Sequence, residues 1–247
     1  MGKVLQVRDL AIGYGGEVLL EEIAFDVQRG EVLAVLGGSG CGKSTLLRTL
    51  IGLQPPLHGR VHFTGIGPPA RAMTPPSFGV LFQSAALFGS STLLQNVLLP
   101  LRKWTDLPED AAAAVAMGRL RLVGLEAFAH HLPSEVSGGM RKRAGIARAL
   151  ALDPPILFLD EPSAGLDPVT AAELDELILT LAKGVRVTIV LVTHELPSIL
   201  RVADQCLMLD RAAGGIIARG APGDLAERST DARVTAFFRR QPLARTS

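Results

Sequence analysis

The sequence is poor in cysteine and in aromatic residues. Its 247 residues include two cysteines, one tryptophan and one tyrosine, and aromatic side chains make up 4% of the total. Cys41 lies in a glycine-rich loop and Cys206 in an apolar, strand-like run, so the cysteines do not indicate a small domain held together by disulfides. We therefore expect a reducing, cytoplasmic setting.

The sequence also lacks long hydrophobic segments. No apolar run approaches the roughly 18–20 residues that a membrane-spanning helix needs. Residues 1–6 contain neither the apolar core of a signal peptide nor the serine or threonine of a myristoylation motif. Any attachment to a membrane is therefore expected to depend on a partner protein.

An excess of positive charge is absent as well. The chain has 25 lysines and arginines against 24 acidic residues, and its densest basic cluster is the short run at residues 141–143. Because nucleic-acid binding by phosphate neutralisation usually requires a basic face, we expect no nucleic-acid partner. Hydrophobic residues make up 48% of the chain, which is enough for the core of one large α/β domain.

The most informative segment is the glycine-rich loop at residues 37–45, which fits the pattern G-x-x-x-x-G-K-[ST]. It follows an apolar, strand-like run at residues 32–36 and opens a helix-like stretch at residues 45–51. The glycines let backbone N–H groups surround phosphate oxygens, while Lys43 adds a positive charge and the Ser44 hydroxyl can bind Mg²⁺. We expect a nucleoside triphosphate to be bound by Gly37, Gly38, Ser39, Gly40, Cys41, Gly42, Lys43, Ser44 and Thr45.

Polar residues follow two further apolar runs, where buried parallel strands would end. Asp160 and Glu161 follow the run at residues 156–159, and His194 closely follows the run at residues 187–192. Ligands of open α/β sheets bind at the carboxyl ends of strands, so Asp160 can hold Mg²⁺ and Glu161 can accept a proton from an attacking water. His194 can reach the same terminal phosphate. A pair of helix-capping acids and a structural histidine are the alternatives.

A second anion-binding segment begins at Ser137. Serine is a favoured N-cap, and Gly138 and Gly139 leave backbone N–H groups exposed at the start of a helix-like stretch. One triphosphate bound near Lys43 does not need two such segments. We therefore expect this one to contact the nucleotide of a second copy of the chain in a symmetric dimer.

The remaining patterns predict an α/β fold in a single domain, residues 1–247. Residues 4–25 indicate short strands broken by a turn at residues 13–16, and residues 59–64 indicate another strand. The glycine- and proline-rich residues 65–76 indicate an irregular loop.

Helices are expected in the middle of the chain. Residues 92–152 are helical in character, and Pro108 with the two acids after it is typical of a helix start. Residues 170–179 indicate the crossover helix between the two buried strands.

In this order, the motifs resemble those of the ATP-binding subunit of an ABC transporter, over essentially the whole chain. The loop at residues 37–45 matches the Walker A motif, residues 156–160 with Glu161 match Walker B and the catalytic glutamate, and His194 matches the switch histidine. Residues 137–141 match the ABC signature, although the sequence has Met140 where glutamine is commonest in this family.

The resemblance extends to three further positions. Gln83 matches the Q-loop glutamine, which contacts Mg²⁺, and Tyr14 falls where the family places an aromatic ring against adenine. Asp167 closes the D-loop at residues 163–167. The resemblance implies ATP and Mg²⁺ as ligands, with the metal held by Ser44, Gln83 and Asp160, and catalysis by Lys43, Glu161 and His194. The nucleotide contacts implied elsewhere are Tyr14, Gln83, Ser137, Gly138, Gly139 and Asp167.

The resemblance also implies a P-loop NTPase core of ABC type, with a small antiparallel β subdomain and a helical subdomain. The helical subdomain corresponds approximately to residues 84–150, between the Q-loop and Walker B. The apolar residues 85–88 correspond to the place where the family receives a permease. Residues 221–247, with Phe237 and Phe238, are a candidate contact with the dimer partner.

Two longer stretches, residues 79–88 and 137–144, resemble the ATPases of Mla-type, Mce-associated lipid transporters. This resemblance implies phospholipid or lipid transport across the bacterial envelope, with a multi-pass permease and an Mce-domain lipid-binding protein as partners. The chain would then lie on the cytoplasmic face of the inner membrane, held there by the permease. Amino-acid importers share much of the pattern, so the ATPase of a metabolite importer is the alternative.

A non-transport ABC ATPase is the remaining class. Such ATPases in chromosome maintenance and DNA repair carry a long coiled-coil insert, and the sequence contains no such insert.

Overall fold

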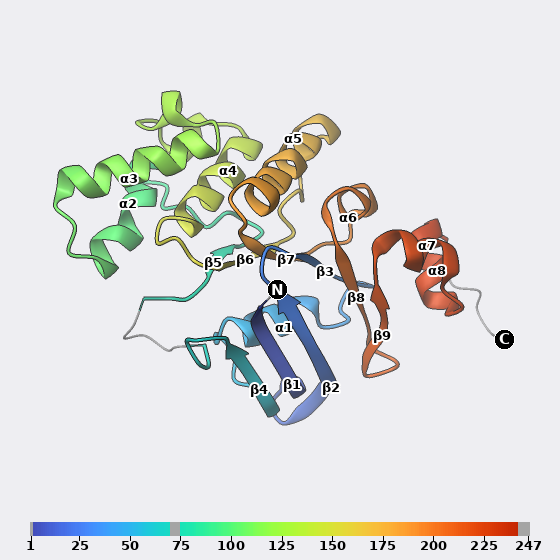
Figure 1. The fold of residues 1–247 in the computed structure, drawn as a ribbon. Coiled ribbons are helices and arrows are strands. Elements are labelled where there is room, and N and C mark those ends of the chain that lie inside the picture. Colours follow the sequence, from blue (N-terminus) through green and yellow to red (C-terminus); the bar gives the residue numbers. More distant parts are fainter. Residues whose placement is uncertain (1, 70–74, 242–247) are drawn as a thin grey trace. The chain divides into compact units, whose positions relative to one another are not determined.

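The computed structural model describes residues 2–69 and 75–241 (Figure 1). The chain forms two compact units, one made of residues 1–69 and 188–247 and the other of residues 70–187. The predicted helical segment at residues 84–150 lies within the second unit. Part of the predicted loop at residues 65–76 lies outside the described residues.

The first unit contains a three-stranded antiparallel sheet in the order β2 (Glu17–Gln28), β1 (Lys3–Tyr14) and β4 (His58–Phe63). The predicted strands and the turn between them are confirmed, but the strands are longer than expected, because β1 and β2 have 12 residues each. Only Gly15 and Gly16 form the turn, and both have positive φ, 59° and 89°. A two-residue turn of that conformation follows the natural twist of a hairpin, so the strands run right up to it.

The first unit also carries the strands that lead to the glycine-rich loop. β3 (Val32–Gly37) pairs in parallel with β7 (Thr188–Val192) on one side and β8 (Gln205–Asp210) on the other. β9 (Gly215–Gly220) pairs antiparallel with β8. Every residue of β3 and β7 is buried, as expected for central parallel strands, and this confirms the two predicted strands.

Three helices at the end of the first unit are α6 (Leu196–Val202), α7 (Pro222–Arg228) and α8 (Ala232–Arg239). Phe238 of α8 is buried, and Phe237 packs against the same apolar cluster of the chain, which contains Ala34, Cys206 and Met208. These two aromatic rings therefore belong to the core of the chain itself, and the expected contact with a dimer partner is not needed to bury them. Residues 242–247 of the same predicted segment lie outside the described residues.

The second unit contains two parallel strands and most of the helices. β5 (Gly79–Leu81) pairs with β6 (Ile156–Asp160). Between them in sequence come α2 (Leu93–Trp104), α3 (Glu109–Leu122) and α4 (Gly138–Ala149), and these three helices pack on one another. β6 is followed by α5 (Pro168–Leu179), which continues into a short π-helical turn, Thr180–Gly184.

Local sequence signals explain where these helices begin. Thr92 and Gln95 form a capping box at the start of α2. Pro108 is the N-cap of α3, which confirms the predicted helix start. Asp167 caps α5 and Pro168 is its first residue, so the crossover helix begins two positions before the predicted boundary.

Among the described residues, no helix combines the length and apolar character that crossing a membrane requires.

Candidate functional site

The glycine-rich loop of the first unit joins the buried end of β3 to α1 (Lys43–Leu50). Gly42, the N-cap of α1, has φ 109°, and none of the described side chains caps this helix. The first N–H groups of an α-helix have no partner within the helix, and they carry its partial positive charge. The loop therefore ends at a helix terminus of the kind that binds anions in proteins, which fits the phosphate-binding role predicted from its sequence.

Two glycines of the loop are required, Gly37 by close packing and Gly42 mainly by its positive φ. A Cβ atom on Gly37, whose φ is 146°, would lie 2.5 Å from the Cys41 Sγ and from the Leu209 carbonyl oxygen. A Cβ atom on Gly42 would lie 2.9 Å from the Leu20 side chain. The two ends of the loop are therefore closely packed and buried, while Gly38, Ser39 and Gly40 between them are exposed.

Lys43 lies across the loop. Its Nζ donates to the carbonyl oxygens of Gly37 and Gly38, at 2.8 and 3.0 Å. These bonds place the ammonium group directly above the loop backbone, where a phosphate would be held. Ser44 is exposed next to it.

Both cysteines of the chain are buried. Cys41 and Cys206 are both free cysteines, which agrees with the expectation that they form no disulfide. Burial raises the pKa of the Cys41 thiol, against the opposing effect of the nearby Lys43 ammonium. Burial also raises the pKa of Cys206 to about 12. Both side chains are therefore neutral at physiological pH, and we assign neither a nucleophilic role.

Tyr14 is the last residue of β1 and lies next to the loop helix. Its hydroxyl is 2.8 Å from Oγ1 of Thr45, in the first turn of α1. The Tyr14 side chain is 54% exposed. An exposed ring anchored at one end can stack on a planar base, which is the role that the resemblance implies for this residue.

His194 also belongs to the first unit, in the segment between β7 and α6. Thr193 is buried and its Oγ1 accepts a hydrogen bond from Glu195 N, which shapes the chain around the histidine. The His194 side chain is 59% exposed, and its Nε2 lies 3.6 Å from Oε1 of Glu195. An exposed imidazole that is not enclosed in the core agrees better with a ligand-facing histidine than with a structural one.

Gln83, Asp160 and Glu161 belong to the second unit, where the paired strands end. Leu81 of β5 is opposite Leu159 of β6 in the parallel ladder, so Gln83 and Glu161 each follow the last pair by two residues. Glu161 has φ 45°, a left-handed conformation that costs a residue with a side chain roughly 1–2 kcal/mol. Such strain is concentrated at functional sites in proteins.

A residue that the sequence analysis missed joins these two segments. Lys142 of α4 is only 6% exposed, and its Nζ donates to the carbonyl oxygens of Gln83 and Glu161, at 2.5 and 3.2 Å. Burial lowers the pKa of Lys142, while the negative charges of Asp160 and Glu161 oppose the shift. A sequence signal existed, because Lys142 precedes the buried Ile146 by four residues and so lies on the buried face of the helix.

Two further polar residues that the sequence analysis missed fix the segment after Gln83. Asn96 is fully buried in α2; its side-chain oxygen accepts from Phe88 N, and its Nδ2 donates to the carbonyls of Phe88, Ser91 and Thr92. Arg148 of α4 donates to the carbonyls of Ala85 and Ala86, at 3.0 and 2.7 Å.

The ABC signature residues of the second unit begin α4. Ser137 is exposed, and its Oγ accepts a hydrogen bond from Met140 N, which confirms the predicted N-cap. Gly139 is buried, and a Cβ atom there would lie 2.3 Å from Cγ2 of Thr170, so a larger residue would require the Thr170 side chain to move. Asp167 caps α5, accepting from the backbone N–H groups of Val169 and Thr170 and from the Thr170 hydroxyl.

The candidate residues therefore divide between the units. The loop, Tyr14 and His194 are in the first unit, and within the second unit Lys142 connects Gln83 to Glu161. Ser137 and Asp167 cap successive helices of the second unit.

Comparison with known proteins agrees with this set of motifs. The chain matches the ABC transporter family over residues 20–164. It is 38% identical to the intermembrane phospholipid transport system ATP-binding protein MlaF of Escherichia coli over 96% of this chain and 89% of that protein. It is 43% identical to the probable ribonucleotide transport ATP-binding protein mkl of Mycobacterium leprae over 85% of this chain, but the match spans only 62% of that longer protein.

Solved structures give the same result. CbiO1 of Clostridium perfringens, described as part of the ABC transporter complex cbiONQ, superposes with a TM-score of 0.82 at 30% identity, covering 92% of both chains. The ATP-binding cassette MJ0796, solved as a dimer bound to ADP and phosphate, has a TM-score of 0.76 at 27% identity and covers 88% of this chain and 98% of that one. The α/β fold is therefore that of the P-loop ATPases of ABC type, with an antiparallel β subdomain, as predicted. The chain belongs to the ABC transporter family, as one of its ATP-binding and ATP-hydrolysing subunits.

Proposed function

We propose that ATP hydrolysis by this chain powers the transport of phospholipid or another lipid across the bacterial envelope. The observation that carries the proposal is the match to MlaF of E. coli, which extends over nearly the whole of both chains. MlaF of Haemophilus influenzae matches similarly, at 34% identity over 96% of this chain and 90% of that one. Matches over nearly the whole of both proteins extend well beyond the shared nucleotide motifs.

ATP is held by the glycine-rich loop and by the ring of Tyr14. The exposed backbone of residues 38–40 and the uncapped first turn of α1 supply N–H donors for the phosphates, and Lys43 supplies the positive charge. Adenine stacks on the ring of Tyr14, a residue that is 54% exposed.

The residues proposed to hold Mg²⁺ fit this ion by their chemistry. Ser44 offers a hydroxyl, Gln83 an amide oxygen and Asp160 a carboxylate, and the first two side chains are exposed. Mg²⁺ prefers oxygen ligands and is usually bound through one or two carboxylates together with the phosphates of the substrate. When bound, the ion supplies positive charge that neutralises the phosphates during transfer.

Hydrolysis depends on groups that orient water and stabilise the terminal phosphate. The Glu161 carboxylate orients the attacking water and accepts its proton, and His194 donates a hydrogen bond to the terminal phosphate. A second copy of the chain completes the site with Ser137, Gly138, Gly139 and Asp167. The related cassette MJ0796 was solved as a dimer, which supports this arrangement.

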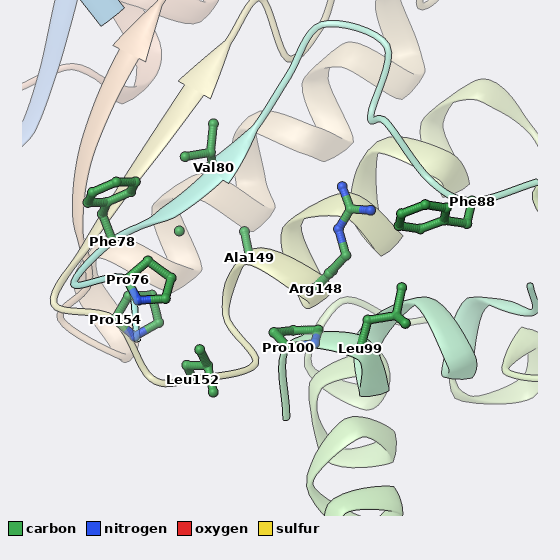
Figure 2. Close-up of a pocket in the computed structure, with 11 residues that line it drawn as sticks. Pro76, Phe78, Val80, Phe88, Leu99, Pro100, Arg148, Ala149, Leu152 and Pro154 are labelled. Atoms are coloured by element: carbon green, nitrogen blue, oxygen red, sulfur yellow. The ribbon is translucent and has the colours of Figure 1, made fainter. Parts of the chain in front are cut away.

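The permease binds at an apolar groove of the second unit. The groove has a volume of about 320 Å³ and lies beside the segment that follows Gln83 (Figure 2). Phe88 is 59% exposed at one end of it, beside Leu99 of α2 and Arg148 of α4. An exposed phenylalanine in an apolar groove fits an amphipathic helix of a membrane protein. This contact holds the chain at the cytoplasmic face of the inner membrane, and an Mce-domain protein completes the transporter.

Purification of the trapped transporter tests this function. A tagged Glu161→Gln chain, extracted from membranes of its native host with ATP present, is expected to bring down a multi-pass permease, an Mce-domain protein and phospholipid. The partners are identified by mass spectrometry and the lipid by extraction. A Lys43→Ala chain purified in parallel is the control for dependence on ATP.

The alternative is the ATPase of a metabolite importer. The observation that favours it is the mycobacterial relative, whose name assigns it to ribonucleotide transport. Co-purification of a permease with a periplasmic solute-binding protein, and without an Mce-domain protein, would overturn the lipid proposal and support this one.

A further inference from the structure

The signature helix α4 carries a buried cation that is not among the nucleotide-binding motifs. Lys142 is 6% exposed, and both hydrogen bonds of its ammonium group described above go to backbone carbonyls. Burying an ammonium group is costly unless it is paired, and an apolar side chain would fill the same space without that cost. The charge at position 142 therefore needs a reason other than packing.

The two carbonyls belong to residues at equivalent positions. Gln83 and Glu161 are each two residues beyond the pair Leu81–Leu159, which is the last pair of the β5–β6 ladder. Beyond that pair, Lys142 Nζ lies between the two chains and donates to both carbonyls. The ammonium group thus continues the connection between the two segments after the strand pairing has ended.

The Glu161 carbonyl that accepts a hydrogen bond from Lys142 belongs to a strained backbone segment. Glu161 has a left-handed φ of 45°, and its carbonyl also accepts from Ala164 N at 3.1 Å, in the turn that follows. Ala85 and Ala86, just after Gln83, have positive φ of 61° and 48°. Their carbonyls accept hydrogen bonds from Arg148, six residues along the same helix from Lys142. Two cations of α4 therefore hold the strained parts of both segments.

We propose that Lys142 is a positioning residue for ATP hydrolysis. By holding the peptides of Glu161 and Gln83 together, it orients the Glu161 carboxylate toward the attacking water and couples its position to that of the Q-loop. This inference rests on the proposed roles of Glu161 and Gln83. It assigns to Lys142 no contact with ATP, so its loss changes the rate of the chemical step and not the affinity for the nucleotide.

The test compares variants of the tagged full-length chain, purified together with its membrane partners. Lys142→Met removes both hydrogen bonds at nearly the same volume, and Lys142→Arg keeps the charge and two donors. Lys142→Gln is a second neutral variant in case the methionine variant does not fold. Arg143→Met removes a charge from the next position of α4, where the arginine pairs with Glu173 and contacts neither Gln83 nor Glu161 in the hydrogen bonds described. Each variant is measured for kcat, KM for ATP, ATP dissociation constant and melting temperature.

Misplacement of a catalytic group by about 1 Å can cost roughly 100-fold in rate, so we expect kcat of Lys142→Met to fall roughly 10- to 100-fold. The KM and the dissociation constant for ATP should stay within about twofold, because the loop that binds ATP is untouched. The kcat of Lys142→Gln should lie between those of Lys142→Met and the parent. Lys142→Arg should restore most of the rate, and Arg143→Met should behave as the parent.

Two results would overturn the inference and leave the proposed function intact. One is a Lys142→Met variant with the parent kcat beside an inactive Glu161→Gln variant. The other is a Lys142→Met variant whose ATP affinity, melting temperature and kcat all fall, with Lys142→Arg restoring none of the three. This pattern would indicate a structural role only. A Glu161→Gln variant that hydrolyses ATP at the parent rate would instead overturn the proposed role of Glu161, on which the inference rests.

Discussion

The hydroxyl groups of Tyr14 and Thr45 are hydrogen-bonded, with 2.8 Å between the two oxygen atoms. This bond joins the end of β1 to the first turn of α1, although the residues are 31 positions apart in sequence. It fixes the single tyrosine of the chain beside the glycine-rich loop, and the residue remains 54% exposed.

Two substitutions of Tyr14 should therefore distinguish the contribution of the ring to ATP affinity from that of the hydroxyl. Tyr14→Ala is expected to weaken ATP binding roughly 5- to 150-fold, because stacking of a base on an aromatic ring contributes about 1–3 kcal/mol. Tyr14→Phe keeps the ring, so its ATP affinity should stay within about threefold of the parent. Titration calorimetry with ATP measures both. Equal affinities for the alanine variant and the parent would contradict the stacking role.

Lys43→Ala should weaken ATP binding through loss of the positive charge above the loop. Hydrogen bonds to charged groups contribute about 1.5–3 kcal/mol, so the dissociation constant should rise roughly 10- to 150-fold. The exposed Lys183, in the π-helical turn after α5, provides a matched control, and Lys183→Ala should bind ATP as the parent does. Unchanged affinity of the Lys43 variant would show that the loop is not the phosphate site.

Ser137 has two expected roles, and two substitutions distinguish them. Ser137→Ala removes the N-cap of α4, which should cost about 1 kcal/mol of unfolding free energy. It also removes a donor to the terminal phosphate bound by the second copy, so kcat should fall roughly 100-fold. ATP binding by the separate chain should not change.

Ser137→Asp keeps an N-cap acceptor but places a negative charge beside the phosphate of the second copy. It should therefore unfold at the parent temperature and still fail to hydrolyse ATP. Melting curves of Ser137→Ala and Ser137→Asp test the effect on stability, and their ATPase rates test the effect on hydrolysis. Full activity of either variant would argue against a site shared between two copies.

Glu31 should destabilise the chain at neutral pH. Burial raises the pKa of its carboxyl group, and the nearby Asp204 acts in the same direction, whereas Gln28 N–H and Arg219 oppose the shift. A carboxyl whose pKa is raised by folding is harder to ionise in the folded chain. Its destabilising effect is absent below the unfolded pKa and grows as the pH rises through the folded pKa.

Glu31→Gln removes the charge and can still accept the hydrogen bond that Glu31 accepts from Gln28 N. It should raise the unfolding free energy by about 0.5–1 kcal/mol at pH 7.5, an ordinary gain for a favourable substitution. The gain should disappear near pH 4, where the parent carboxyl is largely protonated. Thermal unfolding at both pH values tests this, with the exposed Glu17→Gln as control. A gain that is equal at both pH values would exclude the ionisation of Glu31 as its cause.

Much of the candidate site could be predicted because its signals are local. The glycines of residues 37–42, the Ser137 cap and Pro108 act through the backbone of a few neighbouring residues, so a short pattern is enough to identify them. The buried strands β3 and β7 were recognisable for a similar reason, since a strand that is buried on both faces is a continuous apolar run.

Other features depended on residues distant in sequence. Gly13 lies in β1, where it pairs with Val18. A Cβ atom there would lie 1.8 Å from the Glu17 carbonyl oxygen, so this close approach across the hairpin requires glycine, which in the sequence indicates only a turn. From the sequence, Phe238 could equally be an exposed residue that contacts a partner. In the structure α8 packs it against β3 and β8, whose residues are more than 25 positions away.

The sequence by itself thus determined the order and the chemistry of the motifs, because each depends on backbone conformations within a few residues. Only the tertiary structure decided which groups hold those motifs in place. Lys142 reaches Gln83 across 59 positions and Glu161 across 19. No sequence period encodes such distances; they arise when α4 packs against β5 and brings the ammonium group to the end of the β5–β6 pair.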